Sequence, residues 1–203
     1  MFRNAIVVLL LALTGSGLSS AASQNGVEVR LRVLHEGDGR MVFEVTVSNK
    51  GTAPVYAMTN PQRADRSAGP YFIADENDPA LLRCEVKTFP DPTYELYFNG
   101  TRVELKRLRP GEDNREAFSV ALPLMRTVPP YGNEPSRPTV FENRFRRTQA
   151  TVGILPASEG LDKLFEKLGT HSVHGLEPIS PDEAKSPRIF EAQTLLTSNV
   201  VDF

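Results

Sequence analysis

Asp75, Glu76, Asn77 and Asp78 form the densest group of potential oxygen ligands in the chain. Hard cations such as Ca²⁺ bind about six to eight oxygen atoms, and carboxylate and amide side chains in one loop supply several of them. Asn, Asp and Pro are also the residues that favour ordinary solvated turns. We therefore expect a turn with no cofactor here, and a Ca²⁺ site built on Asp75, Asn77 and Asp78 is the alternative.

His171 and His174 are three residues apart, a spacing that places two imidazoles on one side of a helix. Some metal sites use this arrangement, so a small metal-dependent enzyme is one possible function. Both histidines follow Gly169, which is expected to end a helix, and solvated loop histidines are the simpler interpretation. A complete metal site would need further ligands, for which the sequence offers His35, Asp182 and Glu183.

Enzymatic motifs are absent from the sequence. It has no Gly-x-Ser-x-Gly elbow for a serine nucleophile, no His-Glu-x-x-His pair and no glycine-rich phosphate or dinucleotide loop. The residues therefore predict a non-enzymatic protein that binds a partner or has a structural role.

The charge balance is slightly acidic, with 25 acidic and 23 basic residues and a net charge of −2. Such a balance provides no electrostatic footprint for DNA, RNA or an anionic membrane, so we expect no nucleic-acid partner. Arg144, Arg146 and Arg147 form a local basic group. Acidic residues are expected to balance it on solvated strand faces, namely Glu104, Glu112, Glu116 and Glu142.

Residues 1–22 have the order of a secretory signal peptide. Arg3 precedes an apolar run over residues 5–13, and small side chains follow at Ser20 and Ala22. The run is shorter than the roughly 20 residues that span a bilayer, and we expect no membrane span. The sequence thus predicts a secreted or periplasmic protein whose partner is another protein or a component of the cell envelope.

Alternation of apolar and polar residues predicts a mainly β fold. Residues 27–33 and 41–48 alternate most clearly, and Asn99-Gly100 between two alternating runs predicts a hairpin with a type I′ turn. Turn residues separate these runs, which favours an antiparallel sandwich or barrel. The other expected strands are 54–58, 71–74, 81–88, 94–98, 101–105, 117–122 and 149–155.

Cys84 is the single cysteine, so the chain has no intramolecular disulfide and depends on its hydrophobic core. Alternation places Cys84 on the same face as Leu82 and Val86. We expect a buried thiol.

The stretch 123–138 is rich in proline and is expected to be a stiff loop, because each proline removes a donor from a strand ladder. Pro129, Pro130 and Tyr131 would present an aromatic anchor at its tip, which makes them the candidate partner-binding residues. An inhibitor of exported proteases that uses this loop is an alternative function.

Residues 158–169 predict an amphipathic helix with Ser158 as N-cap and Gly169 as the stop. Its apolar residues recur at helical spacing, so this stripe should pack on the sheet. Ser180 to Glu183 have a capping-box pattern, and 189–203 could add a final strand. We expect a β domain over 23–155 and an extension over 156–203 that packs on it.

The passage 43–55, with its turn at Asn49-Lys50-Gly51, resembles the second and third strands of exported immunoglobulin-like sandwich domains. Residues 108–112 with the strand 117–122 resemble a late turn of the same domains, so the resemblance covers about 27–122. It implies an adhesive or structural scaffold and transfers no functional residue. The acidic loop is similar to the calcium-linker motif of cadherin repeats, which implies a Ca²⁺ site there.

The leader predicts export with cleavage after Ala22. N-terminal sequencing of the secreted or periplasmic protein should therefore start at or near Ser23. A mature cytosolic protein that keeps Met1 would contradict this prediction.

Overall fold

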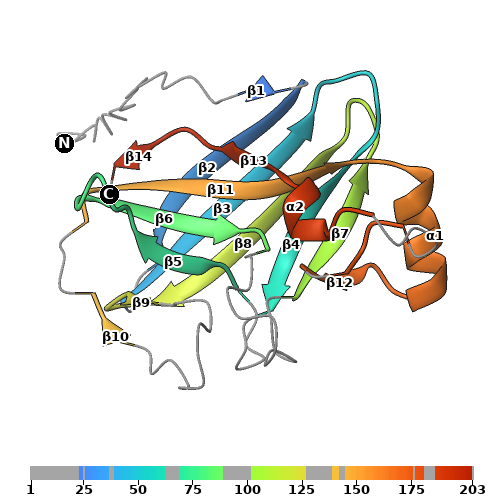
Figure 1. Cartoon of the computed structure of the whole chain (residues 1–203). Coiled ribbons are helices and arrows are strands. Elements are labelled where there is room, and N and C mark those ends of the chain that lie inside the picture. Colours follow the sequence, from blue (N-terminus) through green and yellow to red (C-terminus); the bar gives the residue numbers. More distant parts are fainter. Residues whose placement is uncertain are drawn as a thin grey trace, which may run out of the picture.

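The computed structural model describes residues 23–24, 26–36, 39–62, 69–88, 102–126, 139–141, 145–175, 177–180 and 186–202. Strands account for 57% of the described residues and helices for 11%, which confirms a mainly β fold. Two sheets lie face to face (Figure 1).

The first sheet is antiparallel and has the strand order β1-β2-β3-β8. Alternate residues are buried over 27–31 of β2 and 41–47 of β3, for example Val29 and Val47, which lie opposite each other. This alternation is the one that predicted the two strands. The strands are β1 (Ser23–Gln24), β2 (Val27–Glu36), β3 (Arg40–Asn49) and β8 (Asp113–Ala121).

The second sheet has the order β12-β7-β4-β11-β6-β5, and β13 and β14 also pair with β11. Its strands are β4 (Val55–Gln62), β5 (Tyr71–Ala74), β6 (Leu81–Val86), β7 (Arg102–Leu108), β11 (Arg147–Pro156), β12 (Ser172–His174), β13 (Thr194–Thr197) and β14 (Val201–Asp202). A separate ribbon pairs β9 (Met125–Arg126) with β10 (Thr139–Val140).

The expectation of a purely antiparallel fold is wrong for β6 and β11, which pair in parallel with Cys84 opposite Ala150. A parallel pair requires a long crossover, and the chain between these two strands passes through β7 and β8 before it returns. The prediction assumed that short turns join all neighbouring strands.

The main core lies between the two sheets. Phe43 from the first sheet contacts Phe72 from the second, with ring centroids 4.9 Å apart. Cys84 is fully buried in this core together with Leu82 and Val86, so the predicted buried thiol is confirmed.

Helix α1 (Glu159–Leu168) covers the outer face of the second sheet. The Ser158 hydroxyl accepts a hydrogen bond from the Leu161 N–H, and Gly169 ends the helix with a positive φ of 65°. The predicted caps are confirmed, and so is the apolar stripe for Leu161, Leu164 and Phe165, which are buried; Leu168, the fourth residue of the expected stripe, is exposed at the end of the helix. The tail forms a short helix, α2 (Ile189–Ala192), followed by the two short strands that pair with β11, instead of one continuous strand.

Asn49 links the two sheets at the point where the chain crosses between them. It is fully buried, and its Nδ2 donates to the carbonyl oxygens of Ala53 (2.9 Å) and Leu108 (3.0 Å). Its backbone N–H donates to Glu112 O, and its carbonyl accepts from Gly111 N–H. One residue therefore joins the β3–β4 connection to the β7–β8 connection.

Asn199 closes one side of the space between the sheets. Its Oδ1 accepts from Leu31 N–H at 2.9 Å, and its Nδ2 donates to Leu31 O at 3.2 Å. The amide thereby substitutes for a neighbouring strand at the edge of β2, beside which the C-terminal segment runs (Figure 1).

Several predicted features lie outside the described residues: the Asn99-Gly100 hairpin, the loop tip with Pro129, Pro130 and Tyr131, and most of the capping-box sequence 180–183. None of the helices in the described ranges has the length and apolarity to cross a membrane.

Asn199→Ala should destabilise the fold by about 1–3 kcal/mol, because it leaves both backbone groups of Leu31 without their side-chain partner. Urea unfolding measures this loss. Asn77→Ala, which removes an exposed amide from a turn, is the control and should change stability by less than about 0.5 kcal/mol. Equal effects of the two substitutions would show that Asn199 does not stabilise this edge.

Candidate functional site: a groove beside strand β8

The predicted acidic loop forms a turn that its own side chains stabilise. Asp75 Oδ1 accepts from the backbone N–H groups of Asn77 (2.9 Å) and Asp78 (3.0 Å). Asp78 accepts from Ala80 N–H and pairs with Arg147. The described part of the chain contains no group of three or more His, Cys, Asp or Glu side chains placed to bind a metal. The Ca²⁺ site stays an untested alternative.

The two histidines have different surroundings. His171 lies after α1, with its ring 4.5 Å from that of Phe165, whereas His174 is in β12 opposite Arg102. The side chains of His35, Asp182 and Glu183 lie outside the described residues, so the predicted set is not seen together.

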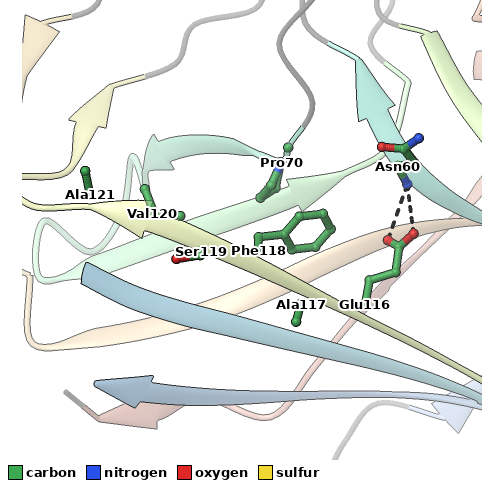
Figure 2. Close-up of a pocket in the computed structure, with 9 residues that line it drawn as sticks. Asn60, Pro70, Glu116, Ala117, Phe118, Ser119, Val120 and Ala121 are labelled. Atoms are coloured by element: carbon green, nitrogen blue, oxygen red, sulfur yellow. Dashed lines mark hydrogen bonds between the residues drawn. The ribbon is translucent and has the colours of Figure 1, made fainter. Parts of the chain in front are cut away.

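A groove of about 520 Å³ runs along the outer edge of β8, where Asn60 and the Gly69-Pro70 segment face it (Figure 2). Among the described residues that line the groove, Glu116 alone has an ionisable side chain. The lining consists of Asn60, Gly69, Pro70, Glu116, Ala117, Phe118, Ser119, Val120 and Ala121.

Asn60 owes its position to an irregularity in β4. The register with β7 shifts between Thr59 and Gln62, and Asn60 has a positive φ of 42°. Asn tolerates this left-handed conformation better than most residues. The irregularity directs the Asn60 N–H toward the Glu116 carboxylate, with distances of 3.0 and 3.3 Å to its two oxygens (Figure 2).

Strand β7 adds charged groups next to the groove. Val103 and Leu105 are buried beneath α1, whereas Glu104 and Lys106 are exposed on the opposite face of the strand. Asn60 Nδ2 donates to Glu104 Oε1 at 3.1 Å, and Lys106 Nζ donates to Asn114 Oδ1 of β8 at 2.8 Å. The open side of the sheet pair is therefore polar where β7 faces β8.

Glu116 has an unusual acidity. The pKa of its carboxyl group is raised to about 7, mainly by burial and in smaller part by the negative charge of Glu104, against the lowering effects of the Asn60 N–H and Lys106. The groove thus contains a half-buried carboxyl group that titrates near neutral pH.

Two other cavities lie elsewhere. One, of about 540 Å³, is mostly apolar and includes Ala53, Ile154 and Leu196. The other, of about 420 Å³, lies at the end of α1, where Tyr56 donates to Asp162 at 2.8 Å. In that cavity the Tyr56 hydroxyl and the Asp162 carboxylate already satisfy each other, so the β8 groove is the better candidate ligand site.

The sequence contained a signal for Glu116 that the strand assignment 117–122 missed. Strand β8 starts at Asp113, and Asn114, Glu116, Phe118 and Val120 all point toward the second sheet. A glutamate in phase with two inward apolar residues marks a carboxylate on the buried face. We had expected this residue on a solvated face.

These features define a mainly β protein of two packed sheets with a ligand-sized groove at the open edge. Comparisons of the chain with protein-family models, curated proteins and solved structures find no match.

Glu116→Gln should flatten the pH dependence of stability. The folded carboxyl group has a pKa of about 7 and the unfolded one about 4.5, so the folded state binds the extra proton between these values. The free energy of unfolding therefore falls as pH rises through this range. Between pH 4 and pH 8, the free energy of unfolding of the wild-type protein should fall by at least about 1 kcal/mol more than that of Glu116→Gln.

Urea unfolding at the two pH values tests this expectation, with the exposed Glu76→Gln as control. If the wild-type protein and Glu116→Gln lose the same stability between pH 4 and pH 8, burial does not raise the pKa of Glu116.

Proposed function

We propose that the chain is an exported binding protein with an immunoglobulin-like scaffold, and that its ligand occupies the β8 groove. The leader at residues 1–22 supports export. The observation that carries the binding site is Glu116, an ionisable side chain half-buried in the wall of an open cavity. Ligand sites typically combine a concave apolar surface with a few placed polar groups.

The composition of the groove favours binding over catalysis. Its described lining contains no histidine or cysteine and no second carboxylate that could share a reaction with Glu116. Both oxygens of Glu116 accept from a backbone N–H, which orients the carboxylate. Phe118, Val120 and Pro70 add an apolar wall. An orienting charge beside apolar surface is suited to recognising a group on a partner protein or an envelope component.

No observation in the described residues favours the other two candidate functions. Protease inhibition depends on Pro129, Pro130 and Tyr131, which lie outside them. A metal-dependent enzyme would need ligands that the described side chains do not bring together.

Val120→Trp should block the groove, because Val120 lines it, is only partly buried and lies on the same face of β8 as Glu116. Titration of ¹⁵N-labelled protein with small ligands of different charge and polarity should shift the amides of Asn60 and residues 116–121. The substitution should weaken this binding roughly tenfold or more.

The matched control is Ala53→Trp, which places the same bulk beside the apolar cavity and should leave affinity unchanged. Binding that maps to Ala53, or that survives Val120→Trp, would overturn the assignment of the site.

A further inference from the structure

In the described part of the chain, the two carboxylates at the groove have one nearby positive charge, that of Lys106. Glu116 and Glu104 both receive hydrogen bonds from Asn60, a neutral residue. Among the described residues, no Lys or Arg lies within 4.0 Å of either carboxylate, and Lys106 donates to Asn114 instead. Among the described residues, the carboxylates of Glu116 and Glu104 therefore outnumber the one nearby cation, Lys106, which keeps its charge while it donates to the neutral amide of Asn114.

We propose that the β8 groove binds a small organic cation, an ammonium or guanidinium group on a short apolar body, whose charge pairs with Glu116. This inference rests on the proposed function and adds the chemical class of the ligand. The groove volume of about 520 Å³ lies within the range of small-molecule sites.

Charge complementarity selects this ligand over the other classes. An anion would meet repulsion from Glu116 and Glu104, and a neutral molecule would leave a half-buried charge uncompensated. A cation placed in a partly desolvated groove has a stronger attraction to the carboxylate than it would have in water.

The wall also favours an organic cation over a metal ion. The Glu116 oxygens already accept a hydrogen bond from the Asn60 N–H, and the described lining provides no second carboxylate. Ca²⁺ needs about six or more oxygen ligands, which this wall does not supply. Phe118 and Pro70 lie along the groove beyond Glu116, where the apolar body of the ligand would pack (Figure 2).

Binding of the cation should depend on pH, because only the ionised carboxylate attracts it. The groups that face Glu116 are Glu104 and Lys106 from β7 and Asn60 from β4, and its own strand adds Asn114 and Phe118. With a pKa of about 7, Glu116 is mostly protonated at pH 6 and mostly ionised at pH 8. Affinity should therefore rise about tenfold between these values.

Two probes of nearly identical shape test the proposal: the n-butylguanidinium ion and neutral n-butylurea. Their dissociation constants are measured from the amide shifts of Asn60 and Ala117. At pH 8, wild-type protein should bind the guanidinium ion at least tenfold more tightly than the urea. Glu116→Gln should reduce this preference at least fivefold, whereas Glu76→Gln, which removes the same charge from an exposed turn, should preserve it.

The outcomes separate the two proposals. Equal affinity for both probes, with Val120→Trp still blocking both, would overturn the cation and leave the groove as the binding site. Loss of the preference in Glu76→Gln as well would also overturn it, because a general charge effect would then explain the result. If neither probe nor any ligand of the wider set shifts groove amides, both proposals fail.

Discussion

The architecture depends on the buried side chain of Asn49. It joins the connection between β3 and β4 to the connection between β7 and β8, two of the places where the chain passes from one sheet to the other. Because β7 and β8 are consecutive in the chain but belong to different sheets, this junction holds together the end from which they diverge. The groove lies farther along the two strands, so the placement of Glu116 near Glu104 follows from the junction.

The two sides of the sheet pair differ for a physical reason. On the β2 side, the C-terminal segment provides Asn199, whose amide satisfies the backbone groups of Leu31. On the β8 side, the first sheet ends while the second continues through β4 and β7, so polar side chains line the uncovered surface. The half-buried state of Glu116 comes from this unequal width of the two sheets.

Local patterns in the sequence predicted local structure well. Alternation located β2 and β3, and the cap residues Ser158 and Gly169 located α1, because these signals act within a few residues. The parallel pairing of β6 with β11 depends on which distant segments meet, and alternation is the same for both strand directions. The site was missed for a related reason: the pKa of Glu116 is set mainly by burial and then by Asn60 and Glu104, and all three depend on segments that meet it only through the fold.

The parallel pairing of β6 with β11 also constrains the order in which the chain can fold. The hairpin of β2 and β3 is local and can form early, whereas Cys84 meets Ala150 only after 66 further residues have been made. Contacts between segments so far apart in the sequence form slowly. Until β11 arrives, β4 and β6 lack the strand that joins them in the second sheet, and their exposed edges are open to pairing with other chains. The nascent protein therefore has a window in which its second sheet is vulnerable to aggregation, and that window ends when β11 pairs with β4 and β6.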